Sequence, residues 1–300
     1  MKFRWRRAKL RFMEFHTLIG VESLRKLEGD PRLAVIDCRF DLMHPEAGRQ
    51  AYLQAHIPGA RYADLARDLS APLGPHTGRH PLPSPEDFAA WLEAIGVGDQ
   101  AQVVAYDDAN GSFAARLWWM LRWVGHRAVA VLDGGFKAWT GAGGALESGE
   151  PKPRGEPFRR ERFTPRIDAQ AVLSTAEVER ALENPAALLV DARAQERYAG
   201  AVEPIDPVAG HVPGAVNHPF GENLDAGGRF LPADELRRRW QERLSGKNAA
   251  NLIAMCGSGV TACHNLLSLE VAGLRGGKLY AGSWSEWIRD PRRPIARGSR

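Results

Sequence analysis

The segment from Cys256 to Ala262 sets a cysteine in a glycine-rich turn, Cys-Gly-Ser-Gly-Val-Thr-Ala, directly after the apolar run 252–255. Glycine permits backbone conformations in which consecutive amides point into one concavity, and the helix expected after the turn adds partial positive charge at its N-terminus. Both features favour an anion at the sulfur, and the thiolate is the reactive form of cysteine. The pattern predicts a nucleophile at Cys256; the alternative is a small apolar side chain buried at a strand end.

Short apolar runs alternate with helical patterns along the chain. The strands and helices that they predict must hold the turn at Cys256 in place. The runs are typical of strands buried on both faces and cover residues 33–37, 102–106, 128–132, 188–191 and 251–255. Helices are predicted after Ser84, which is followed by Pro85 and two acids, and over residues 233–243. This alternation predicts an α/β fold, with a mainly parallel sheet covered by helices on both faces. In such sheets, sites lie beyond the carboxyl ends of the strands.

Three motifs of the first half recur in the second half, which indicates a duplication. Asp37-Cys38-Arg39 returns as Asp191-Ala192-Arg193, residues 56–60 (His-Ile-Pro-Gly-Ala) return as 211–215, and residues 135–139 correspond to 283–287. We therefore predict two tandem domains of one fold, over residues 16–142 and 168–297. The segment 143–167 is dense in Gly, Pro and charge, and is expected to be an extended linker.

Composition excludes several classes of protein and partner. The chain has 300 residues, a length that suits two domains, and 40 Lys and Arg against 36 Asp and Glu leave a net charge of +4, with the basic residues scattered. We expect no nucleic-acid partner, and no membrane partner because every apolar window is too short to span a bilayer. Three cysteines cannot form a disulfide framework and favour a reducing compartment, the cytoplasm. Residues 1–12 are expected to form a disordered arm, with an organelle targeting peptide as the alternative.

The loop at Cys256 resembles the active-site loop of the rhodanese superfamily. The two His-x-Pro-Gly-Ala segments, Asp191-x-Arg193 and the closing Gly282-Ser283-Trp284-x-x-Trp287 are similar to its tandem-domain sulfurtransferases. The resemblance implies that Cys256 takes a sulfur atom from 3-mercaptopyruvate or thiosulfate, holds it as a persulfide and passes it to cyanide, a thiol or thioredoxin. It implies no metal and no organic cofactor. The oligomeric state stays open.

The resemblance also assigns roles to individual residues. The backbone from Gly257 to Thr261, including Gly259 and Val260, would hold the outer sulfur, and Arg197 would bind the anionic donor. Arg193 belongs to the same rim but is expected to be structural, paired with Asp191 or another acid. From the first domain, His80 would approach Ser258, oriented by Asp64 or Asp68; a plain surface role for His80 is the alternative. The first domain is expected to be silent, because Asp107 stands where the second domain has Cys256.

The donor and some alternatives stay open at this stage. Relatives that use mercaptopyruvate usually carry a second substrate arginine where this chain reads Glu203-Pro204-Ile205-Asp206-Pro207, whereas thiosulfate enzymes tend to place cations in the loop, here Gly257 and Ser258. A cysteine phosphatase is disfavoured because Ala262 stands where the Cys-x5-Arg motif needs arginine. A non-enzymatic sulfur carrier or regulatory protein built from rhodanese units remains an alternative.

A metal site made of Cys256, Cys263 and His264 is disfavoured by its spacing. Cys263 is expected to be a packing residue, with a resolving thiol as the alternative. The tryptophans of residues 118–123 are expected to pack a helix rather than line a ligand site.

Overall fold

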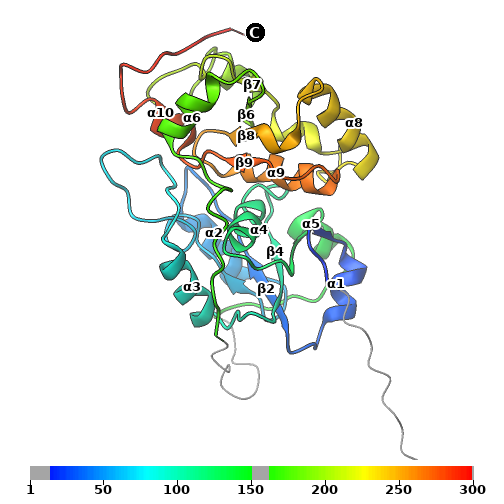
Figure 1. Ribbon diagram of the computed structural model, residues 1–300. Coiled ribbons are helices and arrows are strands. Elements are labelled where there is room, and N and C mark those ends of the chain that lie inside the picture. The colour runs from blue at the N-terminus through cyan, green and yellow to red at the C-terminus, as the bar shows by residue number, and fades with distance from the viewer. Residues whose placement is uncertain (1–13, 151–161, 299–300) are drawn as a thin grey trace, which may run out of the picture.

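Two α/β domains lie one above the other in the computed structural model (Figure 1), which describes residues 14–150 and 162–298. The expected basic arm and residues 151–161 of the expected linker lie outside the described residues. The rest of the linker contains no helix, and within it Glu147 forms an isolated antiparallel bridge with His56.

The first domain is built on a parallel sheet of five strands in the order β1-β5-β4-β2-β3. Its elements are β1 Leu18–Ile19, α1 Val21–Leu27, β2 Leu33–Asp37, α2 Glu46–Gln54, β3 Arg61–Tyr62, α3 Pro85–Ala94, β4 Gln102–Tyr106, α4 Ala114–Trp123, β5 Val129–Leu132 and α5 Gly135–Gly141. Helix α3 begins as predicted, because the Ser84 side chain accepts a hydrogen bond from the Asp87 N–H at 3.0 Å and Pro85 follows it.

The second domain repeats the plan with four parallel strands in the order β7-β6-β8-β9. Its elements are α6 Thr175–Leu182, β6 Leu188–Asp191, α7 Gln195–Tyr198, β7 Val216–Asn217, η1 Phe220–Asn223, α8 Ala233–Leu244, η2 Ala249–Asn251, β8 Leu252–Met255, α9 Thr261–Val271, β9 Lys278–Leu279 and α10 Ser283–Trp287. The predicted fold class is confirmed, and the central strands β2, β4, β6 and β8 coincide with predicted apolar runs to within one residue.

The repeated motifs occupy equivalent places in the two domains. Arg39 and Arg193 each bind the aspartate two residues earlier through two guanidinium nitrogens, and each stacks on an aromatic ring at the start of the last helix, Phe136 or Trp284. A fixed pair of this kind locks the turn after the strand. The duplication therefore extends to the geometry of the strand ends.

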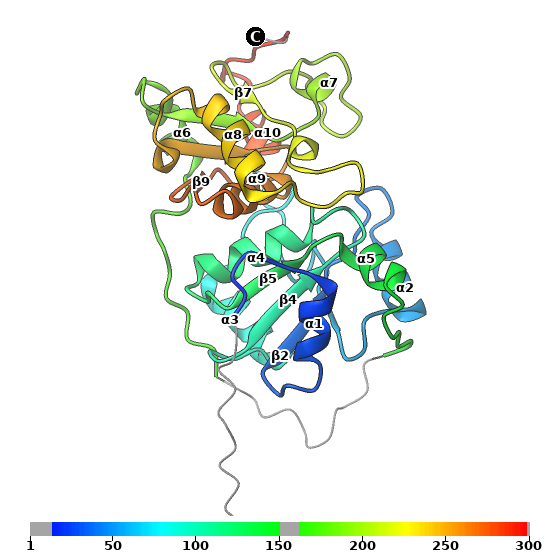
Figure 2. The same cartoon turned by 90° about the vertical axis from the view of Figure 1, so that its right-hand side faces the viewer.

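Helices α4 and α9 join the domains through an apolar interface. Nine of the ten residues of α4 are buried, and its side chains share one hydrophobic cluster with those of α9. Figures 1 and 2 show both helices between the two sheets, with α9 facing the lower domain. Since α9 begins directly after the Cys256 loop, the first domain packs against the helix that carries this loop. The tryptophans of α4 belong to this packing, as predicted.

No helix in the described part of the chain is long and apolar enough to cross a membrane.

Candidate active site

Cys256 is the first residue after β8, and its side chain lines a cavity between the domains. The residue is 2% exposed. The cavity has a volume of about 290 Å³. Its wall includes Leu42 and Phe113 from the first domain and Arg197 and Phe220 from the second. A parallel sheet thus presents the thiol at the carboxyl end of a central strand, where the sequence places it.

The loop after Cys256 offers unpaired backbone N–H groups. Among the described residues, none accepts a hydrogen bond from the N–H of residues 257–260. The first turn of α9 follows at Thr261, so these amides lie at the positive end of a helix dipole. A run of free amides at such a place can bind an anion.

Ser283 holds the start of the loop and was missed by sequence reasoning. Its Oγ accepts a hydrogen bond from the Cys256 N–H at 3.1 Å and donates one to the Tyr280 carbonyl at 2.8 Å. Its backbone is left-handed, with φ of 53°, an unusual conformation for a residue with a side chain. The equivalent Gly135 has φ of 58°. This alignment of a serine with a glycine is the signal that could have identified Ser283.

Asp107 occupies the equivalent point of the first domain and shows what this kind of loop binds. Its carboxylate accepts four backbone hydrogen bonds at 2.8–2.9 Å, from residues 109, 111, 113 and 114. Complete burial raises the pKa of Asp107 above its usual range, and the four N–H groups oppose that rise. In the first domain the loop amides therefore bind a carboxylate of the chain itself.

Two arginines of the second domain reach the rim of the Cys256 cavity. Arg197 donates from Nε and Nη2 to Glu203, at 3.1 and 2.7 Å, and from Nη2 to Asp206 at 3.2 Å. Arg193 is held by Asp191, as expected, and also by Glu203 and the Gly210 carbonyl. Both arginines line the cavity, but Arg193 has more of its donors engaged.

His80 of the first domain meets the loop through Ser258. The His80 Nδ1 lies 2.8 Å from Ser258 Oγ. Burial, together with the nearby guanidiniums of Arg116 and Arg79, lowers the pKa of His80 to about 3, so the ring is neutral at physiological pH. A neutral imidazole can accept or donate the proton that it shares with the serine.

A model of the rhodanese-like domain matches the chain twice, over residues 20–142 and 174–290. The chain belongs to the rhodanese family.

Relatives place this chain among the sulfurtransferases. It is 50% identical to a probable 3-mercaptopyruvate sulfurtransferase of Pseudomonas aeruginosa over 94% of its own length and 98% of the relative's. It is 39% identical to a putative thiosulfate sulfurtransferase of Mycobacterium tuberculosis, over 90% and 93% of the two chains. The solved 3-mercaptopyruvate sulfurtransferase from Leishmania major superposes with a TM-score of 0.79 at 31% identity, covering 92% of this chain and 76% of that one. The protein is a sulfurtransferase.

The other loop residues predicted to bind the outer sulfur differ in whether they line the cavity. Gly257, Val260 and Thr261 line the cavity. Gly259 lies outside the cavity lining, and its carbonyl accepts hydrogen bonds from Arg116 Nη1 at 3.2 Å and Cys263 Sγ at 3.3 Å. Gly259 has a φ of 76°, and a Cβ atom added there would lie 2.4 Å from the Ala281 carbonyl oxygen, so no side chain fits at this position.

The structure gives Asp64 partners other than His80. Its carboxylate accepts hydrogen bonds from the N–H groups of Ala66 and Arg67, and its own N–H donates to Asp68. His80 is held instead by Arg116, a fully buried arginine of α4, which donates to the His80 carbonyl at 3.1 Å. Sequence reasoning missed Arg116, since its position within an apolar helix gave no sign that it reaches the other domain's loop.

The thiols of Cys38 and Cys263 are buried in the hydrophobic core. Burial raises the pKa of Cys263 to about 12 and also raises that of Cys38, so both remain protonated thiols. Residues 14–150 and 162–298 contain no group of three His, Cys, Asp or Glu side chains that could hold a metal ion.

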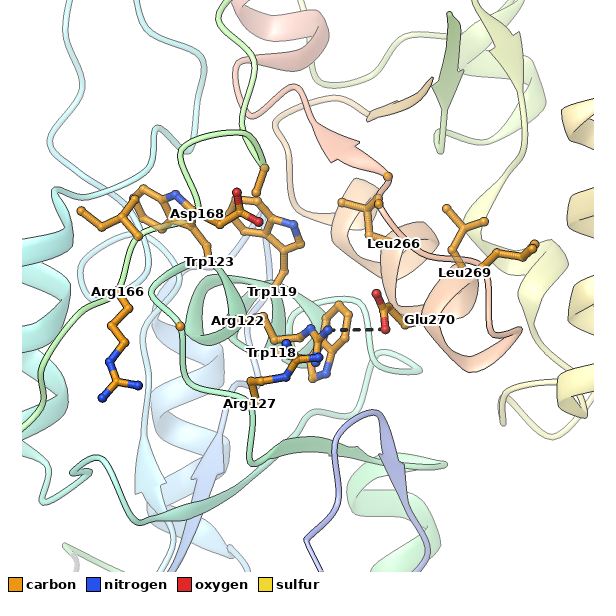
Figure 3. A pocket seen from close by; sticks show the side chains of 16 residues that line it. Trp118, Trp119, Arg122, Trp123, Arg127, Arg166, Asp168, Leu266, Leu269 and Glu270 are labelled. Atoms are coloured by element: carbon orange, nitrogen blue, oxygen red, sulfur yellow. Dashed lines mark ion pairs between the residues drawn. The ribbon is translucent and has the colours of Figure 1, made fainter. Parts of the chain in front are cut away.

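A larger cavity, of about 510 Å³, opens elsewhere along the interface (Figure 3). It is lined by indole rings of α4 and crossed by the ion pair of Arg122 with Glu270 at 3.4 Å. Its lining includes neither a cysteine nor a histidine. The Cys256 cavity is therefore the candidate active site.

Proposed function

We propose that this sulfurtransferase removes the sulfur atom of 3-mercaptopyruvate, holds it as a persulfide on Cys256 and passes it to a thiol or cyanide. One observation carries the proposal: Cys256 opens into a cavity that the second domain lines with two arginines and free loop amides, whereas the side chain of Asp107 occupies the equivalent loop of the first domain. The equivalent loop of the first domain binds a carboxylate, so the loop after Cys256 is suited to bind a thiolate and the persulfide anion that it becomes.

The first half-reaction is a displacement at sulfur. The Cys256 thiolate attacks the thiol sulfur of the donor, an S–S bond forms and the donor's C–S bond breaks. The electron pair of that bond leaves on carbon as the enolate of pyruvate, which takes up one proton to give pyruvate. In the second half-reaction an acceptor thiolate or cyanide attacks the outer sulfur and returns the Cys256 thiolate.

The pair of Ser258 and His80 favours 3-mercaptopyruvate over thiosulfate. The Ser258 hydroxyl lies on the cavity wall and is hydrogen-bonded to a neutral imidazole, so it can pass a proton to the enolate carbon and be reprotonated through His80. Thiosulfate would leave as sulfite, whose departing electron pair stays on sulfur and requires no such proton.

The roles of the remaining residues follow from their positions. Arg197 binds the donor's carboxylate, the amides of Gly257 to Thr261 stabilise the outer sulfur, and Arg193 fixes the rim through Asp191 and Glu203. The acceptor is a small thiol, cyanide or the exposed thiol of a protein such as thioredoxin. We place the protein in the cytoplasm, where reducing conditions keep the three free cysteines as thiols.

Parallel assays with the two donors test the proposal. Purified protein is given 3-mercaptopyruvate or thiosulfate with cyanide as acceptor, and thiocyanate is measured. We expect a higher kcat/KM with 3-mercaptopyruvate, and no turnover after Cys256→Ser, while Cys263→Ser retains activity because that thiol is buried outside the cavity. Absence of turnover with both donors would exclude the enzyme and favour a sulfur carrier.

A further inference from the structure

Arg116, a residue of α4, donates hydrogen bonds to three backbone carbonyls and has no carboxylate partner. Its Nη1 donates to the Gly259 carbonyl at 3.2 Å, and its Nη2 donates to the carbonyls of Leu69 and His80 at 3.2 and 3.1 Å. The side chain is fully buried, and no Asp or Glu in the described part of the chain forms an ion pair with it. Burial of a charge without an opposite charge is costly, which distinguishes Arg116 from a residue that only fills the core.

The first of these carbonyls belongs to the active-site loop. The earlier carbonyls of the loop, those of Cys256 and Gly257, accept hydrogen bonds from N–H groups of α10, whereas the Gly259 carbonyl is held from the first domain. In a trans peptide the C=O and the N–H of the next residue point in opposite directions. Arg116 therefore turns the Val260 N–H away from itself, and Val260 lines the Cys256 cavity.

The first domain contains the same arrangement with the roles of the domains exchanged. Asn110 is the third residue after Asp107, as Gly259 is the third residue after the cysteine, and both have a left-handed backbone, with φ of 58° and 76°. The Asn110 carbonyl lies 3.2 Å from Nε2 of His264, a residue of α9 in the second domain. Each loop therefore has this carbonyl bound by a side chain from the interface helix of the other domain.

The loop of the first domain shows where the next N–H points. The Gly111 N–H, which follows the bound Asn110 carbonyl, donates to the Asp107 carboxylate at 2.8 Å. In the second domain Val260 takes the place of Gly111, and its N–H has no acceptor among the described residues. The duplication therefore directs the Val260 N–H toward the side chain of Cys256.

We propose that Arg116 is a positioning residue for sulfur transfer, which sets the peptide after Gly259 so that the Val260 N–H donates to the outer sulfur of the persulfide. The inference rests on the proposed function and names the side chain that prepares the loop for its anion. A donor that is oriented in advance stabilises charge without having to move during the reaction. The first domain thereby takes part in the chemistry of the second.

The rate of sulfur loading separates this role from a contribution to folding alone. 3-Mercaptopyruvate is mixed with wild type, Arg116→Met or Arg116→Lys without an acceptor, and the reaction is quenched at increasing times. The intact mass then gives the fraction of protein that has gained one sulfur atom. A residue that only stabilises the fold changes the fraction of the protein that can be loaded. A positioning residue changes the rate constant of the fraction that loads.

The loading rate constant of Arg116→Met should fall by about tenfold to a hundredfold, less than for the loss of a whole donor, because the Val260 N–H remains but is no longer held in place. The donor concentration that gives half the maximal rate should change by less than about threefold, since Arg197 is untouched. Arg116→Lys should fall between Arg116→Met and the wild type, because it retains the charge without the planar fork.

Arg122→Met is the matched control. Arg122 lies on the same helix and also reaches the second domain, where it pairs with Glu270 at 3.4 Å, but it lines the larger cavity of Figure 3. Its loading rate constant should remain that of the wild type. An unchanged rate constant in the Arg116 variants, or an equal fall in Arg122→Met, would overturn the inference. If Arg116→Met gives no loadable protein, Arg116→Lys decides by the same criterion. Absence of sulfur loading in the wild type would instead contradict the proposed function.

Discussion

Asp107 and Cys256 occupy the same point in two copies of one fold. The backbone carbonyl of each residue accepts a hydrogen bond from the start of the last helix of its domain, from the N–H of Phe136 at 2.8 Å and of Trp284 at 3.0 Å. In the first copy the loop amides are saturated by a carboxylate that cannot carry sulfur. In the second copy a short thiol leaves the amides free. The two loops thus differ in whether a side chain of the chain itself already binds their amides.

The Asp107→Asn variant tests whether the first loop needs an anion. The amide is the same size, but its NH2 group would face two of the four backbone N–H donors, so buried donors would lose their acceptor. We expect the free energy of unfolding to fall by about 2 to 3 kcal/mol, measured by urea denaturation, with kcat/KM little changed.

The exposed neighbour Asp108 provides the matched control, because no other residue in 14–150 or 162–298 donates a hydrogen bond to its carboxylate. Asp108→Asn should shift stability by less than about 0.5 kcal/mol. Equal stability of the two variants would show that the first loop does not depend on a charged acceptor.

At the scale of elements, the site depends on how the loop between β8 and α9 packs against the start of α10 and the turn before it. The N–H groups of Trp284 and Ser285 donate to the carbonyls of Cys256 and Gly257 at 3.0 and 2.9 Å. Gly259 packs its Cα against Ala281 on the same turn. The loop conformation is therefore set by its neighbours as well as by its own glycines.

Replacement of Gly259 by alanine should disrupt this packing. The added methyl would meet the Ala281 backbone and would have to adopt a φ of 76°. We expect a loss of about 1 to 3 kcal/mol in unfolding free energy and a fall in kcat larger than the change in KM, because the loop amides move away from the sulfur. Gly221→Ala is the control, since nothing lies within 4 Å of a Cβ there and its φ is not positive; equal effects of the two changes would refute the account.

The sequence predicts the elements better than it predicts the contacts between them. Strands β2, β4, β6 and β8 follow from runs of apolar residues, because a strand buried on both faces needs such side chains throughout. The prediction of Cys256 as the nucleophile likewise rests on local sequence, on the glycines and the expected helix that follow it. Arg79 and Arg116 could not be predicted, since their partners Asp206 and Gly259 lie more than 100 residues away and only the docking of the domains brings them together.

At the scale of the whole molecule, the domain interface contains the polar groups that complete the site. Arg116 crosses from α4 to the Gly259 carbonyl, His80 reaches Ser258, and the His264 Nε2 lies 3.2 Å from the Asn110 carbonyl. These contacts sit beside the apolar packing of α4 on α9. The first domain thereby contacts and supports the Cys256 loop.

Burial of these histidines makes the stability depend on pH. The pKa values of His80 and His264 fall to about 3, below the 6.5 of an unfolded histidine, mainly because both are buried. Between these values the unfolded chain binds more protons, so the free energy of unfolding falls as the pH falls below 6.5. From pH 7 to 5 we expect a loss on the order of 2 kcal/mol for each histidine, measured by urea denaturation at both pH values.

Variants assign this pH dependence to the interface. His264→Asn should reduce the difference in unfolding free energy between pH 7 and pH 5, whatever the absolute stability of the variant. Exchange of the exposed His44 for asparagine should leave this difference unchanged. A difference that is the same in His264→Asn as in the wild type would rule out His264 as its source.

The central claim is that Cys256 alone carries the sulfur, and the intact mass of the protein tests it most directly. After incubation with 3-mercaptopyruvate in the absence of an acceptor, the mass should rise by one sulfur atom and return to its first value when cyanide is added. The gain should be absent in Cys256→Ser and retained when Cys38 or Cys263 is replaced by serine. A sulfur adduct that persists in Cys256→Ser, or turnover without any adduct on the wild type, would contradict the account.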